Sequence, residues 1–170
     1  SYGKKSAAEI LEEAQEFFNQ ISVEDRDELE AALSKATPDH PRFGFYNGGF
    51  TVLELKDPDV MNRLLPGRDP AWRMLDVSVL HELLIERVMD ISKEAVERKE
   101  NIEYLRDPRM GYDAVDQDEA EFLFVLNPTR MEQVRACTAA GEKMPQKSTD
   151  FYPKVISGMV MMPIGVDERL

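Results

Sequence analysis

The sequence contains a single cysteine, Cys137, so it cannot form an internal disulfide. It also lacks the Cys and His ligands of a structural zinc site, because only two histidines accompany that one thiol. No apolar run approaches the ~20 residues needed to span a bilayer, and no basic segment followed by an apolar one opens the chain. We therefore expect a cytoplasmic protein without membrane association.

Basic residues are also scarce, with 21 Lys and Arg against 33 Asp and Glu and a net charge of -12. Such a charge repels phosphate backbones, so nucleic acid is not an expected partner. Residues 127–166 are the exception, with five basic side chains against three acidic ones. An anionic ligand would bind in this range, whose basic residues are Arg130, Arg135, Lys143, Lys147 and Lys154.

With 170 residues, of which 42% are apolar, the chain has enough material for one self-supporting core. We expect a single domain over residues 1–170 that forms the C-terminal part of a longer polypeptide. Residues 1–37 would be a helical lead-in, and residues 40–164 the main body of the domain.

Capping and periodicity predict the first elements. Ser6 and Glu9 have the spacing of a capping box, and the apolar residues that follow recur at helical spacing through Phe17 and Phe18. A second helix is predicted to begin at Ser22 as its N-cap and to end before Pro38. Residues 42–56 then change period around Asn47-Gly48-Gly49, which predicts a β-hairpin.

The rest of the chain predicts an α+β fold, a mixed sheet covered by helices in the approximate order α-α-β-β-α-β-α-β-α-β. The strongest helical signal starts at Asp76 as a cap and runs to Ile91. Residues 122–127 are nearly all apolar and predict a central strand buried on both faces. The other expected elements are an irregular connection over 57–72, a short exposed helix over 92–101, a strand over 102–107, an acidic connection over 108–121, a helix capped by Thr129 and Glu132 and followed by Gly141, and a last strand over 155–164.

One segment, residues 141–148, comes within one residue of the phosphate-loop pattern G-x-x-x-x-G-K-[ST]. The second glycine is replaced by Gln146, and the order of elements is helix, loop, strand, so a true Walker site is not expected. A looser anion site remains a hypothesis. Its charges would come from Lys147 and Lys154, and its hydroxyl donors from Ser148 and Thr149. The alternative is a structural turn pinned to the core by Phe151 and Tyr152.

Other reactive side chains favour structural interpretations. His81-Glu82 lacks the second histidine of a zinc protease motif, because Ile85 occupies that position, and His81 is expected at the edge of a core. His40 belongs to a turn, and Cys137 is expected to be a packed, inert thiol on the inward side of its helix. The acidic side chains of residues 113–119 lack the spacing of a calcium loop. We therefore predict no catalytic residue and no metal site in this chain.

Four stretches carry a family resemblance: LDVSVLHELLIE, NIEYLRD, FLFVLNPTRMEQV and, above all, AGEKMPQKSTDFYPKVISGMV. They resemble the C-terminal half of domain-of-unknown-function family 1015, over most of residues 40–164. The signature positions matched here are Lys147, Ser148, Thr149, Pro153 and Lys154. Members of this family are described as similar to chromosome-partitioning ParB proteins, and the signature of their N-terminal part is absent from this sequence.

The resemblance implies a module that completes or regulates a nucleotide or phosphate-ligand site together with the N-terminal part of the same polypeptide. It implies no cofactor within this chain, a nucleotide in the intact protein and, for any enzyme activity, phosphate transfer. A homo-oligomer is a further expected partnership. The alternative is a non-catalytic protein-interaction or scaffold domain.

Overall fold

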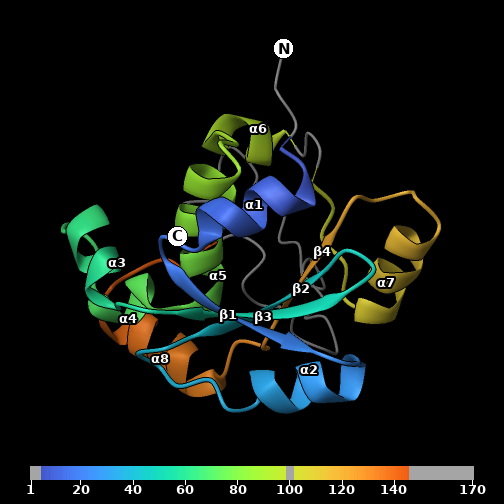
Figure 1. Ribbon diagram of the computed structural model, residues 1–170. Coiled ribbons are helices and arrows are strands. Elements are labelled where there is room, and N and C mark those ends of the chain that lie inside the picture. Colours follow the sequence, from blue (N-terminus) through green and yellow to red (C-terminus); the bar gives the residue numbers. More distant parts are fainter. Residues whose placement is uncertain (1–4, 99–101, 146–170) are drawn as a thin grey trace, which may run out of the picture.

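A four-stranded antiparallel sheet with helices on both faces organises the computed structural model, which describes residues 5–98 and 102–145 (Figure 1). The expected α+β class is confirmed. The spatial order is β1-β3-β2-β4, and every pairing is antiparallel, whereas we expected a mixed sheet. The strands are β1 (Phe18–Val23), β2 (Arg42–Tyr46), β3 (Phe50–Leu55) and β4 (Leu123–Leu126).

The predicted hairpin is confirmed as β2 and β3, which pair from Arg42 with Glu54 to Tyr46 with Phe50. Gly48 has a φ of +89°, a conformation that glycine adopts without the steric penalty of a side chain. The N–H of Asn47 donates to the carbonyl of Gly49 at 3.3 Å and closes the turn.

The predicted helical lead-in is wrong in its middle part. Helix α1 (Ala7–Ala14) has the expected capping box of Ser6 and Glu9, but it ends before Phe17. Phe18 begins strand β1 and packs edge-on against Phe43 of β2, with ring centroids 5.9 Å apart. A tertiary contact to a strand 25 residues further on therefore overrides the local helical spacing, which alone could not predict β1.

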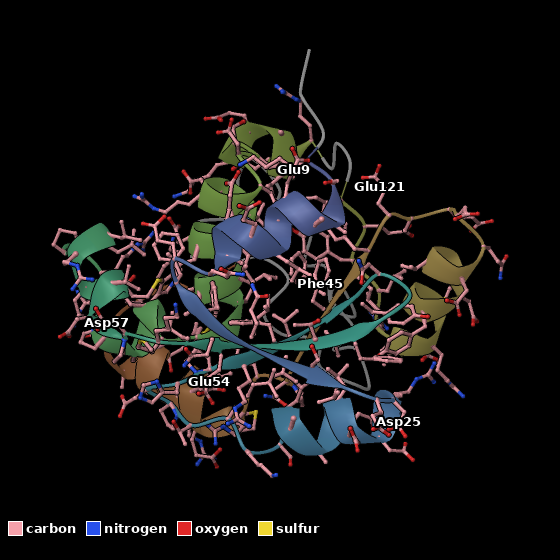
Figure 2. The ribbon with its side chains drawn as sticks, in the orientation of Figure 1. Glu9, Asp25, Phe45, Glu54, Asp57 and Glu121 are labelled. Carbon is pink, nitrogen blue, oxygen red and sulfur yellow. The ribbon has the colours of Figure 1, made fainter. Side chains whose placement is uncertain are left out.

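Helix α2 (Arg26–Leu33) begins three residues later than a Ser22 cap would imply. Its N-cap is Asp25, labelled in Figure 2, whose Oδ1 accepts the N–H of Glu28 at 2.9 Å. Ser22 lies in β1 instead. Ser and Asp are both favourable N-cap residues. Ser22 does not cap the helix because β1 pairs with β3 as far as Val23, so the helix begins only after Asp25.

The strong helical signal is confirmed as a continuous helix, α5 (Asp76–Val79) followed by the π-helix η1 (Leu80–Val88). Four residues of the predicted stripe are buried, while Ile91 lies beyond the helix end; the four are Val77, Leu80, Leu84 and Val88. The π winding was not predicted, and Leu75 rather than Asp76 occupies the N-cap position. Asp76 is the first helical residue.

Two predicted connections contain helices. Residues 57–72 form α3 (Asp59–Leu64) and α4 (Pro70–Arg73), and the acidic segment contains α7 (Pro108–Asp116). At α4 and α7 an Asp-Pro dipeptide supplies an N-cap carboxylate and a proline at the first helical position. The short helix α6 (Lys93–Glu97) is confirmed, while residues 102–107 form no strand.

Strand β4 is confirmed, but it lies at one edge of the described sheet and its residues are only partly buried, so the central position was wrong. Helix α8 (Met131–Ala139) follows it. Its cap is one residue later than predicted, with the N–H of Arg130 donating to Gln133 Oε1 at 2.8 Å. Gly141, with a φ of +74°, follows the helix in the left-handed conformation as expected. The last predicted strand, 155–164, lies outside the described residues.

The core lies on both faces of the sheet. Phe45, labelled in Figure 2, belongs to the cluster on the face covered by α1, α5 and η1. A second cluster joins α2 and α7 to the other face through Leu29, Val52 and Tyr112. A third joins α4 to α8 and contains Trp72, Leu75, Val77 and Cys137.

Candidate functional site

The predicted anion-binding residues Lys147, Ser148, Thr149 and Lys154 all lie outside the described residues. The structure describes the chain up to Pro145, and therefore describes the residues from which this loop starts. We call Glu142–Pro145 the loop base.

The loop base is held on helix α4 by side-chain hydrogen bonds. Glu142 accepts the backbone N–H of Asp69 at 2.9 Å and the guanidinium of Arg68 at 2.8 Å. These two partners, the Asp69 N–H first, hold the pKa of Glu142 below its ordinary value. The indole N–H of Trp72 donates to the carbonyl of Lys143 at 3.0 Å. Glu142 and Lys143 are therefore fixed by three hydrogen bonds to α4 and the two residues before it, some 70 residues earlier in the chain.

Packing reinforces these bonds. Trp72 is only 8% exposed, and the Arg68 guanidinium lies over its ring, 4.5 Å from the centroid. Met144 packs against the same cluster, and the thiol of Cys137 donates to the carbonyl of Ala71 at 3.2 Å. Nothing in the sequence of α4 predicted this contact, because its four residues are too few to show a period. The Asp-Pro start at Asp69 was the available signal.

A second polar contact joins the segment between β4 and α8 to the start of the long helix. The side chain of Asn127 hydrogen-bonds to the largely buried carboxyl of Asp76 and donates to the carbonyl of Leu33 at 3.0 Å. Burial raises the pKa of Asp76 to about 6, although Arg130 and Asn127 oppose the shift.

An unpaired donor lies close by in sequence. Arg73 donates from one guanidinium nitrogen to the carbonyl of Leu65 at 3.2 Å, while its Nε is buried and has no hydrogen-bond partner. The Nε of Arg73 is thus a buried donor without an acceptor among the described residues.

The interpretations of the two histidines agree with their positions. His81 is half-buried on η1, where its Nε2 lies 3.3 Å from the hydroxyl of Tyr104 and the two rings are stacked. Burial lowers the pKa of His81, with nearby Lys93 acting in the same direction and Glu82 opposing it. His40 lies in the turn before β2, with Nδ1 2.8 Å from the carbonyl of Leu55.

Cys137 is fully buried, as predicted, and burial raises the pKa of its thiol. In the acidic segment, Asp116 accepts the hydroxyl of Tyr46 at 2.6 Å. Within residues 5–98 and 102–145 no three His, Cys, Asp or Glu side chains are grouped to hold a metal ion. No helix in these ranges is long and apolar enough to cross a membrane.

An open cleft of about 660 Å³ lies between α1 and the end of η1. Four of the seven residues that line the cleft are glutamates, so the lining repels anions. The glutamates are Glu9, Glu12, Glu13 and Glu16, and the other lining residues are Phe17, Arg87 and Val88. Lys5 partly neutralises it by donating to Glu13 and to the carbonyl of Val88, both at 2.6 Å. This cleft is therefore not a phosphate site, and it lies apart from the loop base.

Comparisons with known proteins add no neighbour: no protein-family model, no curated protein and no solved structure matches this chain.

Proposed function

We propose that this chain is the C-terminal module of a ParB-like protein of domain-of-unknown-function family 1015, and that its Lys-Ser-Thr loop binds a phosphate group. Lys147 and Lys154 would neutralise the phosphate charge, and Ser148 and Thr149 would donate hydrogen bonds to its oxygens. The N-terminal part of the same polypeptide would supply the rest of the site, and a nucleotide is the ligand class that the family resemblance favours.

The observation that carries this proposal is the attachment of the loop base to α4. A binding loop needs a rigid support, because ordering a free loop at the moment of binding costs conformational entropy. Glu142 and Lys143, only a few residues before Lys147, are held by three hydrogen bonds. The Glu142 carboxylate accepts two of them, and the Lys143 carbonyl accepts the third. The loop therefore starts from a fixed point.

The charge around the loop base is consistent with an anionic ligand. Arg68 is already paired with Glu142, but Arg73 has a buried Nε without a hydrogen-bond partner. In a chain of net charge -12, residues 127–166 carry five basic side chains against three acidic ones and should repel an anion less than the remainder of the chain.

Calorimetric titration of ATP, ADP and CTP against the full-length protein tests the proposal. Lys147→Ala is expected to weaken binding roughly tenfold or more, the effect of losing a charged hydrogen bond. The matched control is Lys143→Ala, because Lys143 contacts α4 through its backbone carbonyl and its side chain is exposed. Equal affinity of the native protein and Lys147→Ala would end the proposal.

A second candidate is a non-catalytic interaction or scaffold domain. It is favoured by the structural roles of the two reactive side chains Cys137 and His81. Cys137 is packed in the core and bonds to the carbonyl of Ala71, and His81 contacts the hydroxyl of Tyr104. In this case the loop fastens the end of the chain to the body of the domain. Phe151→Ala or Pro153→Ala would then lower the melting temperature, while Lys147→Ala would leave ligand binding and stability unchanged.

A further inference from the structure

Strand β1 has one edge without a partner strand in the described part of the chain. It pairs with β3 over all six residues, and β3 pairs with β2 on its other side. In Figure 1, α1 covers one face of the sheet and α2 the other, with the edge of β1 between them. An edge of this kind presents backbone donors and acceptors to any strand that approaches.

The direction of these groups follows from one bond. The N–H of Lys56 donates to the carbonyl of Phe17 at 2.9 Å, just before β1 begins. Because hydrogen-bonded positions alternate in an antiparallel ladder, the odd-numbered residues of β1 bond toward β3. Phe18, Gln20 and Ser22 therefore direct their backbone N–H and C=O groups away from the sheet.

The edge lacks the features that usually block pairing. The six residues of β1, Phe-Asn-Gln-Ile-Ser-Val, include no charged residue, no proline and no glycine. Edge strands of monomeric proteins are commonly protected by lysine, proline or a bulge. Here the central side chain, Ile21, is instead 42% exposed, among the few large apolar side chains with such exposure in the described residues.

We propose that β1 binds β1 of a second copy of this chain, antiparallel, with Ile21 facing Ile21 across a two-fold axis. Gln20 of each copy then pairs with Ser22 of the other through the outward backbone groups. Ile21 falls in a non-hydrogen-bonded pair, the geometry that brings opposite side chains closest, with Cα atoms about 4.5 Å apart. The two sheets would join into one of eight strands, each keeping its helices on the same faces.

A second copy is the occupant that the sequence of β1 fits best. An uncharged strand pairs with itself without placing like charges opposite each other. Beyond the strand the flanking residues are mainly acidic, with Glu16 on one side and Glu24 and Asp25 on the other, so they add to the repulsion between two copies. The net charge of -12 opposes association of two copies, and salt should therefore strengthen this dimer. A basic partner from another protein would respond to salt in the opposite way.

Sedimentation equilibrium of the whole chain tests the proposal. The native chain is expected to dimerise weakly, with a Kd in the high micromolar range typical of small interfaces, and more tightly in 0.5 M than in 0.02 M NaCl. Ile21→Lys places two like charges on the axis and should raise the Kd at least tenfold. Met131→Lys is the control, because Met131 is a similarly exposed apolar residue, 50% exposed, on α8.

Cross-linking gives a second readout that does not require a charged variant to fold. Ile21→Cys should form a symmetric disulfide between two chains under mild oxidation, since the native Cys137 is fully buried. Met131→Cys should cross-link only at the rate of random collision. A native chain that remains monomeric at 1 mM in high salt, with equal cross-linking of the two cysteine variants, would overturn the proposal.

Discussion

Asp76 carries the most quantitative prediction of the structure. Its carboxyl is largely buried at the start of the long helix, and its pKa rises from 3.8 to about 6. Because the pKa of Asp76 is higher in the folded than in the unfolded state, the folded state binds the proton more tightly. The stability gained from this protonation is fully present below pH 3.8 and is lost as the pH rises through 6. A difference of about two pKa units corresponds to about 3 kcal/mol in the free energy of unfolding.

Asp76→Asn removes this cost while keeping the shape of the side chain and a hydrogen-bonding group for Asn127. We therefore expect the variant to be about 3 kcal/mol more stable than the native protein at pH 8, and about equally stable at pH 4, where the native carboxyl is neutral.

Urea unfolding at several pH values between 4 and 8 measures this difference directly. Asp39→Asn, at an exposed turn position, is the control and should change the free energy of unfolding by less than about 0.5 kcal/mol at every pH. A pH-independent difference between native protein and Asp76→Asn, or a less stable variant at pH 8, would show that the carboxyl is not held in a low-dielectric environment.

Three further predictions concern packing, the loop base and the histidine. Gly44→Ala should destabilise the fold by about 1–3 kcal/mol in chemical denaturation, because its Cβ would lie 3.1 Å from Val125 Cβ and 2.9 Å from Leu29 Cδ2; an unchanged stability would mean that β4 shifts freely. Glu142→Ala should lower the melting temperature by leaving the N–H of Asp69 without its acceptor, and Glu142→Gln should lower it less; thermal melts of both compare them. The pKa of His81 is lowered in the folded state, so its neutral ring contributes stability above pH 6.5 that is lost as the pH falls below that value. His81→Gln should therefore reduce the acid sensitivity of the fold. An NMR titration that shows the ring titrating above pH 6.5 would contradict the reasoning.

Local chemistry was sufficient to predict part of the fold. The hairpin around Gly48, the cap at Ser6 and the buried stripe of the long helix depend on interactions within a few residues, and the structure confirms them. Asp-Pro dipeptides were ambiguous, because the same residues favour a turn and the first turn of a helix. Two of them begin helices here, at Asp69 and Asp107.

The errors lie where distant residues decide the structure. Phe17 and Phe18 fit a helix locally, yet Phe18 is a strand residue because Phe43 and Leu55 lie beside it. The apolar composition of β4 suggested a central position, which in this sheet belongs to β3 and β2. The attachment of Glu142 to α4 joins residues more than 70 positions apart, so no local pattern could predict the loop base.

The sheet order has a consequence for how the chain folds as it is synthesised. Strands β1, β2 and β3 are close in sequence and can associate once Leu55 has left the ribosome. Strand β4 then inserts beside β2 only after Leu126 emerges, so Gly44 and its neighbours await their second partner for about 70 residues. At 5–20 residues per second this interval lasts some seconds, during which the β2 edge of a nascent three-stranded sheet is exposed to chaperones and to other nascent chains.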